Sequence, residues 1–148
     1  MRFRLPEWDV NMPPPLVGYW TAWNEPRLDR VREHLEMAVT ADIQWNDPRD
    51  SFDGIDELEA AVRRLRAAKP EYRFVIASEI DCHHDRLRYR WDMHRKGRVL
   101  MSGLDVATLS RDGTHICRVD GFFGDPTPIK TEASGVPGEL RAQPGLRP

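Results

Sequence analysis

Residues 86–109 predict a long β-hairpin, and no other stretch limits the fold of this chain as strongly. Its first half shows the period-2 pattern of a strand with one buried face, formed by Leu87, Tyr89, Trp91 and Met93. Residues 95–97 form the turn, and residues 98–109 are apolar on both faces apart from one carboxylate, Asp105. Because an unpaired buried carboxylate is costly, Asp105 either lies at an edge or serves a function.

Three helices are predicted before this hairpin, and further strands on both sides of it. Apolar residues at helical spacing indicate helices that begin near Leu16, Pro26 and Gly54. Alternating residues indicate strands at 41–48, 72–82 and 115–124, the last of which follows a turn at 111–113. The order helix, helix, strand, helix and then four consecutive antiparallel strands predicts an α+β domain with its helices on one face of a curved antiparallel sheet.

The length of 148 residues predicts a single domain with an irregular segment at each end. Residues 1–13 form an irregular lead-in, residues 14–125 the domain, and residues 126–148 a tail. Because the tail contains five prolines and three glycines, it is not expected to supply core or regular structure.

Charge and hydropathy exclude several classes of protein. A net charge of −2 offers no basic surface for nucleic acid or for an anionic membrane. No apolar run approaches the ~18 residues of a membrane helix, and the N-terminus lacks the apolar core of a secretory signal. We therefore expect a cytoplasmic protein, whose cysteines, Cys82 and Cys117, are reduced and buried in strands.

Four short motifs occur in a family-specific order: Trp23-Asn24, Trp45-Asn46-Asp47-Pro48, Gly54 and Gly121-Phe122-Phe123-Gly124. With the order of elements, they make residues 14–125 resemble the nuclear transport factor 2-like (NTF2-like) superfamily, and within it the SnoaL-type polyketide cyclases and ketosteroid isomerases. The resemblance implies a sheet curled into a cone around the helices, with an apolar pocket inside. It also implies a homodimer formed through the outer face of the sheet, and chemistry without a cofactor.

The resemblance further implies three catalytic residues: Tyr19 on the first helix, Asp47 at the end of the first strand, and Asp105 on a late strand. Asp47 shares a predicted strand face with Trp45. A carboxylate base removes a proton next to a carbonyl only if the developing enolate oxygen is stabilised. A tyrosine hydroxyl and a neutral carboxylic acid can both donate hydrogen bonds to that oxygen, as in ketosteroid isomerases. Asp47 is therefore the predicted base, and Tyr19 and Asp105 are the predicted donors.

Strand parity and neighbouring positions predict an aromatic and methionine-rich pocket wall. Its predicted members are Trp23, Trp45, Tyr89, Trp91, Met93, Met101, Val119 and Phe123. Such a wall suits a small, flat, apolar or aromatic ligand better than a sugar or a nucleotide.

Each catalytic candidate also has an ordinary structural interpretation. A tyrosine on an amphipathic helix commonly packs in the core, and an aspartate before proline commonly caps turn amides. The run from Cys82 to Asp85 is not interpreted as a metal site, because adjacent strand residues point to opposite faces. Two functions therefore stay open: a cofactor-independent isomerase or cyclase, and a non-catalytic module that binds an apolar ligand or dimerises.

Overall fold

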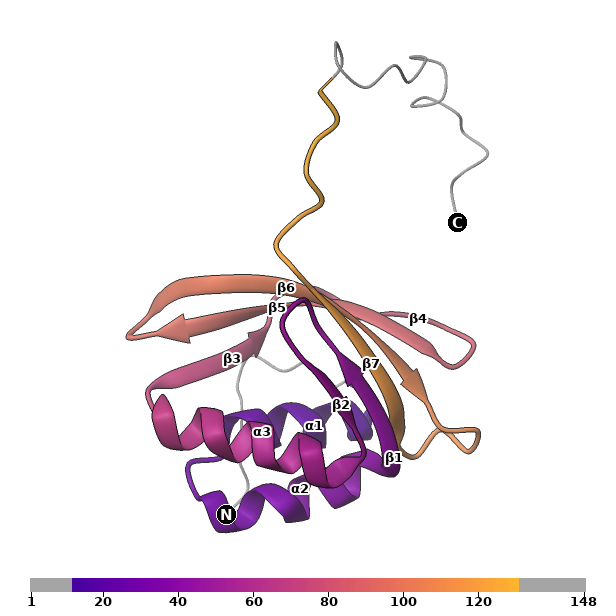
Figure 1. The fold of residues 1–148 in the computed structure, drawn as a ribbon. Coiled ribbons are helices and arrows are strands. Elements are labelled where there is room, and N and C mark those ends of the chain that lie inside the picture. Colours follow the sequence, from indigo (N-terminus) through magenta and orange to yellow (C-terminus); the bar gives the residue numbers. More distant parts are fainter. Residues whose placement is uncertain (1–11, 131–148) are drawn as a thin grey trace.

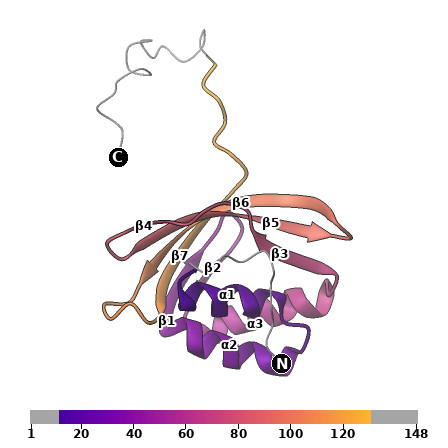
Figure 2. The same cartoon turned by 180° about the vertical axis from the view of Figure 1, so that it is seen from behind.

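The computed structural model of the chain describes residues 12–130, so most of the predicted lead-in and tail lies outside the described residues. The helical elements are α1 (Pro14–Asn24), the short 3-10 helix η1 (Leu28–Arg30), α2 (Val31–Ala38) and α3 (Ile55–Ala68). The strands are β1 (Val39–Asn46), β2 (Ser51–Asp53), β3 (Tyr72–Ile76), β4 (Asp81–His83), β5 (Arg86–Arg95), β6 (Arg98–Leu109) and β7 (Ile116–Phe123). Figures 1 and 2 show the three α-helices together on one side of a curved sheet.

The sheet has the strand order β2-β1-β7-β6-β5-β3, and β4 adds a second partner to β5. The first and last strands of this order do not pair, so the sheet curves without closing and forms the predicted α+β cone. One part of the prediction was wrong, because the sheet is mixed rather than antiparallel throughout. β1 runs parallel to β7, whereas the other pairs are antiparallel.

The strand predicted at 72–82 is two strands, β3 and β4, which pair with different parts of β5. At the interruption the Ser78 Oγ accepts the Arg90 N–H at 2.8 Å, where a strand carbonyl would normally do so. Between the strand predicted at 41–48 and the helix predicted from Gly54 lies a short strand that was not predicted, β2, which pairs with the end of β1.

The two cysteines are free, but their predicted burial was wrong for Cys82. Cys82 is exposed because β4 is only three residues long and all three are exposed. Cys117 in β7 is half-buried. Among residues 12–130, no helix has the length and apolarity that crossing a bilayer requires.

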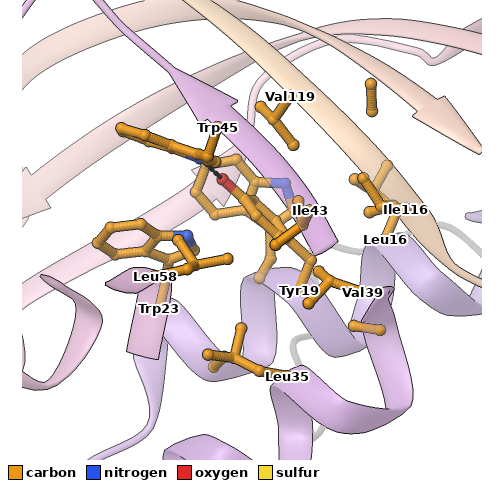
Figure 3. Packing of buried hydrophobic residues seen from close by; sticks show 14 of the residues in the cluster. Leu16, Tyr19, Trp23, Leu35, Val39, Ile43, Trp45, Leu58, Ile116 and Val119 are labelled. Atoms are coloured by element: carbon orange, nitrogen blue, oxygen red, sulfur yellow. Dashed lines mark hydrogen bonds between the residues drawn. The ribbon is translucent and has the colours of Figure 1, made fainter. Parts of the chain in front are cut away.

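The core lies between the helices and the concave face of the sheet (Figure 3). The three α-helices and strands β1 and β7 contribute fully buried side chains, among them Leu16, Leu35, Ile43, Leu58, Val62 and Ile116. Burial of one such side chain contributes about 1.5–3 kcal/mol relative to leaving it exposed. The helical and strand periods read from the sequence therefore match the side chains that the fold buries.

A buried asparagine fixes the end of α1 against β3. The Asn24 side chain donates to the Phe74 carbonyl and accepts the Phe74 N–H, both at 2.7 Å. Trp20 and Trp23 on the same helix pack against the Phe74 ring, with centroids 5.6 and 5.7 Å away. This contact sets how α1 presents its aromatic side chains to the concave face.

The β5–β6 hairpin contains a bulge that was not predicted. Its turn at Lys96 and Gly97 has positive φ values of 49° and 76°, as a two-residue hairpin turn requires. Next to the turn His94 pairs with Val99, but further along Met93 pairs with Met101, so Leu100 has no partner across the hairpin. A bulge of this kind shifts the pairing by one residue and bends the strand.

Candidate active site

A cavity of about 600 Å³ lies between the concave face of the sheet and helices α1 and α3. All three predicted catalytic residues, Tyr19, Asp47 and Asp105, line it. Six of the eight predicted wall residues line it as well: Trp23, Trp45, Trp91, Met93, Met101 and Phe123. The other two, Tyr89 and Val119, lie in the core instead, and each is only 1% exposed.

Asp105 faces the cavity because of its register in the sheet. It pairs with Tyr89 of β5, so both side chains point to the concave face. Its Oδ1 accepts the Trp91 indole N–H at 2.9 Å, and its Oδ2 accepts the Tyr89 hydroxyl at 3.1 Å. Tyr89 was predicted as a wall residue, but it is buried in the core, where its hydroxyl contacts Asp105.

Two glycines make room for this carboxyl group and for its indole partner. Gly103 pairs with Trp91, and a Cβ at Gly103 would lie 2.2 Å from the indole ring. Gly121 pairs with Asp105, and a Cβ there would lie 2.8 Å from Oδ1. Glycine within a strand often marks such a close approach, so this signal was present in the sequence.

Gly121 is also the place where the two acidic residues come together. The same Cβ position lies 3.7 Å from the Asp47 Cβ, so Asp47 and Asp105 approach one point from different strands. Sequence reasoning named both acids but did not identify the glycine between them.

Burial raises the pKa of the Asp105 carboxyl from 3.8 to about 7. The hydrogen bonds from Trp91 and Tyr89 oppose the rise because they stabilise the charged form, whereas the nearby charge of Asp47 adds to it. The Asp105 carboxyl therefore keeps its proton to a higher pH than an exposed aspartate does. In its protonated form this residue can donate a hydrogen bond into the cavity.

Tyr19 is 1% exposed and lines the cavity. Its oxygen accepts the Trp45 indole N–H at 2.7 Å, drawn as a dashed line in Figure 3. No acceptor within residues 12–130 takes the hydroxyl hydrogen, which leaves it for a ligand. Burial and the charge of Asp105 raise the pKa of Tyr19 well above its usual value, so the group is a donor and not a base.

Asp47 lies just after β1, not within it, so the predicted strand face shared with Ile43 and Trp45 was wrong at this position. Its Oδ1 accepts the N–H groups of Arg49 and Asp50, each at 2.8 Å, which is the turn-capping role of an aspartate before proline. Within the described chain no donor contacts Oδ2. Asp47 therefore forms the turn with one oxygen and keeps the other available.

Several cavity residues were not predicted. Phe52 of β2 stacks on Trp45 with ring centroids 5.1 Å apart, and Phe74 closes the wall beside α1. The mouth also carries three exposed cations, Arg49, Arg64 and Lys69. Arg64 lies next to Leu65 on α3 and Lys69 directly follows this helix, and their positions beside its apolar residues are the signal that could have indicated them.

The chain matches the family model described as SnoaL-like domain over residues 16–119. No curated protein sequence matches it. Among solved structures, it is similar to a SnoaL-like protein of Agrobacterium tumefaciens for which isomerase activity has been suggested. The two are 29% identical with a TM-score of 0.70, over 75% of this chain and 95% of that one.

Two further solved structures share the fold at lower identity. A suggested polyketide cyclase of Sinorhizobium meliloti is 15% identical with a TM-score of 0.60, over 75% of this chain and 95% of that one. An NTF2-like protein of unknown function from Cytophaga hutchinsonii is 10% identical with a TM-score of 0.57, over 74% of this chain and 87% of that one. The chain therefore belongs to the SnoaL-like family and has the NTF2-like α+β fold.

Proposed function

We propose that this protein is a cofactor-independent enzyme that moves a proton next to a carbonyl group of a small apolar molecule, as an isomerase or an aldol-type cyclase. One observation carries the proposal: Asp47 and Asp105 approach each other at Gly121, on the wall of a cavity that Tyr19 also lines. The surrounding wall is largely aromatic, which suits a flat apolar substrate.

In this mechanism Asp47 is the base. Its Oδ1 is held by two backbone N–H groups, so the carboxylate is fixed in place, while Oδ2 is available to take a proton from the carbon next to the substrate carbonyl. The electron pair of the broken C–H bond passes to the carbonyl oxygen and forms an enolate. A positioned base of this kind contributes about 100- to 10,000-fold to the rate.

Tyr19 and protonated Asp105 stabilise the enolate oxygen. Both groups are buried, and a hydrogen bond to a developing charge is stronger in a low-dielectric site than in water. The Trp45 N–H donates to the Tyr19 oxygen and so strengthens its hydroxyl as a donor. In an isomerisation the substrate carries a C=C bond next to the deprotonated carbon, and the conjugated enolate takes the proton from Asp47 back at the far end of that bond. In a cyclisation the enolate carbon attacks a second carbonyl, and the alkoxide that forms takes the proton from Asp47.

The names of two similar proteins support this choice of chemistry. Isomerase activity has been suggested for the relative from A. tumefaciens, and polyketide cyclase activity for the protein from S. meliloti. Both reaction types can proceed through an enolate, which a base and two oxygen-directed donors would serve.

The test is deuterium exchange of 2-tetralone, a flat aromatic ketone, in D₂O with the wild-type protein and with Asp47→Asn. The asparagine oxygen can still accept the two turn N–H groups, so the fold is expected to persist, as circular dichroism would check. We expect the exchange rate above buffer to fall by about 100-fold or more. Asp50→Asn, a change to the next acid on the same rim, is the matched control and should keep the wild-type rate.

If the Asp47→Asn variant exchanges deuterium at the wild-type rate, Asp47 is not the base. If 2-tetralone binds to the wild-type protein with no exchange above buffer, the enzyme proposal fails, and the same cavity is better described as a non-catalytic binding site.

A further inference from the structure

The mouth of the cavity has a different chemistry from its interior. Tyr19 and Asp105 are buried, whereas Arg49, Arg64 and Lys69 line the same cavity from exposed positions. Within residues 12–130, none of these three cations has a carboxylate oxygen within 4.0 Å. A ligand that reaches from the interior to the mouth would therefore meet unpaired positive charge.

Two of the three cations lie over aromatic rings. The Arg49 guanidinium is 5.0 Å from the centroid of the Phe123 ring, and the Lys69 Nζ is 5.9 Å from that of Tyr72. Phe123 and Tyr72 also line the cavity. A cation over a ring face is attracted to it without being neutralised, so it remains able to bind an anion.

Helix α3 separates its charges between two faces. Arg64 lines the cavity together with Leu65 and Ala68 of α3, and Lys69, which directly follows the helix, lines it as well. The neighbouring Arg63 is not a cavity residue, and its guanidinium pairs with Glu59 at 3.3 Å. Two acidic residues, Asp47 and Asp50, also line the cavity, and they belong to the turn after β1 that carries Arg49.

We propose that Arg64 and Lys69 form an anion-binding subsite at the mouth, and that the substrate is a flat apolar ketone with a carboxylate remote from its reacting carbonyl. The inference rests on the proposed function, since Tyr19 and Asp105 would hold the carbonyl end. The three cations at the mouth outnumber the two acids beside them, Asp47 and Asp50, by one, which matches a singly charged carboxylate better than a doubly charged phosphate.

The experiment compares two probes of nearly the same shape, naphthalene-2-carboxylate and naphthalene-2-carboxamide, by isothermal titration calorimetry. We expect the wild-type protein to bind the carboxylate about 5- to 10-fold more tightly than the carboxamide, as two exposed ion pairs allow. The ratio of the two affinities should fall to about one in the double variant Arg64→Gln/Lys69→Gln. It should also fall in 0.5 M salt, because exposed charges are screened.

Arg63→Gln is the matched control, since it removes a cation of the same helix that faces away from the cavity, and it should keep the wild-type ratio. Equal binding of both probes by the wild-type protein would overturn the subsite, and so would a carboxylate preference that survives in the double variant. If the preference is found while 2-tetralone exchange is absent, the anion-binding subsite is retained, and the proposed proton transfer is rejected together with the assignment of the substrate as a ketone.

Discussion

Replacement of Asp105 by asparagine should make the stability of this protein less dependent on pH. The carboxyl is 4% exposed, and its pKa is raised to about 7 chiefly by burial. Between pH 3.8 and about 7 the folded protein keeps a proton on Asp105 that the unfolded chain has released. The folded state therefore loses stability as the pH rises through this window, and Asp105→Asn removes the loss.

The size of the effect follows from the width of that window. Each pH unit between the two pKa values changes the free energy of unfolding by about 1.4 kcal/mol, so the full difference is on the order of 4 kcal/mol. The asparagine can retain both contacts, because its oxygen can accept the Trp91 N–H and its amide group can donate to the Tyr89 oxygen. The wild-type protein and the variant should therefore differ mainly in this titration.

The assay is urea unfolding of both proteins from pH 4 to pH 9 at constant ionic strength. Subtracting one free energy of unfolding from the other cancels the titration of all other groups. The advantage of Asp105→Asn should grow with pH up to about 7 and then stay level. A difference that does not change with pH, or that changes in the opposite direction, would refute the description of Asp105 as a buried acid with a raised pKa.

Two further substitutions test the packing around the site by urea unfolding. Gly121→Ala should lower the free energy of unfolding by about 1–3 kcal/mol, because its Cβ would lie 2.8 Å from Asp105 Oδ1. This loss should be smaller when Asp105→Ala is already present, and an equal loss there would contradict the contact. Trp45→Phe keeps an aromatic ring but removes the 2.7 Å hydrogen bond to Tyr19, so it should lower the free energy of unfolding by about 1–2 kcal/mol. The loss should be much smaller when Tyr19→Phe is already present. Strictly additive costs would mean that this hydrogen bond contributes nothing.

The helix and strand periods made most of the fold predictable. The apolar stripes that predicted three helices are buried in the structure, and the hairpin ends within a residue of its predicted limits. The break at Ser78 could not be read in the same way, because a single side chain replaces a backbone acceptor there and the alternation continues through it. The parallel pairing of β1 with β7 joins segments far apart in the chain, and local patterns do not report such pairings.

The candidate site was predictable where strand parity or a motif applied. Asp105 stood out as a carboxylate among apolar residues, and Asp47 as an aspartate before a proline. Arg64 and Lys69 did not stand out, because on a helix surface they resemble the ordinary solvated cations of the chain. Only the packing of α3 against the open side of the sheet gives these two charges a shared position.

The bulge at Leu100 divides the β5–β6 hairpin into two segments whose alternation is out of phase. A residue gained or lost between the turn and Leu100 changes the pairing only on the turn side of the bulge. The orientation of Asp105, on the other side, therefore does not depend on the length of the turn. The five residues from Met101 to Asp105 have no such tolerance, since one insertion among them would rotate the acid to the outer face. Redesign of this hairpin could therefore vary its tip freely but should keep that interval unchanged.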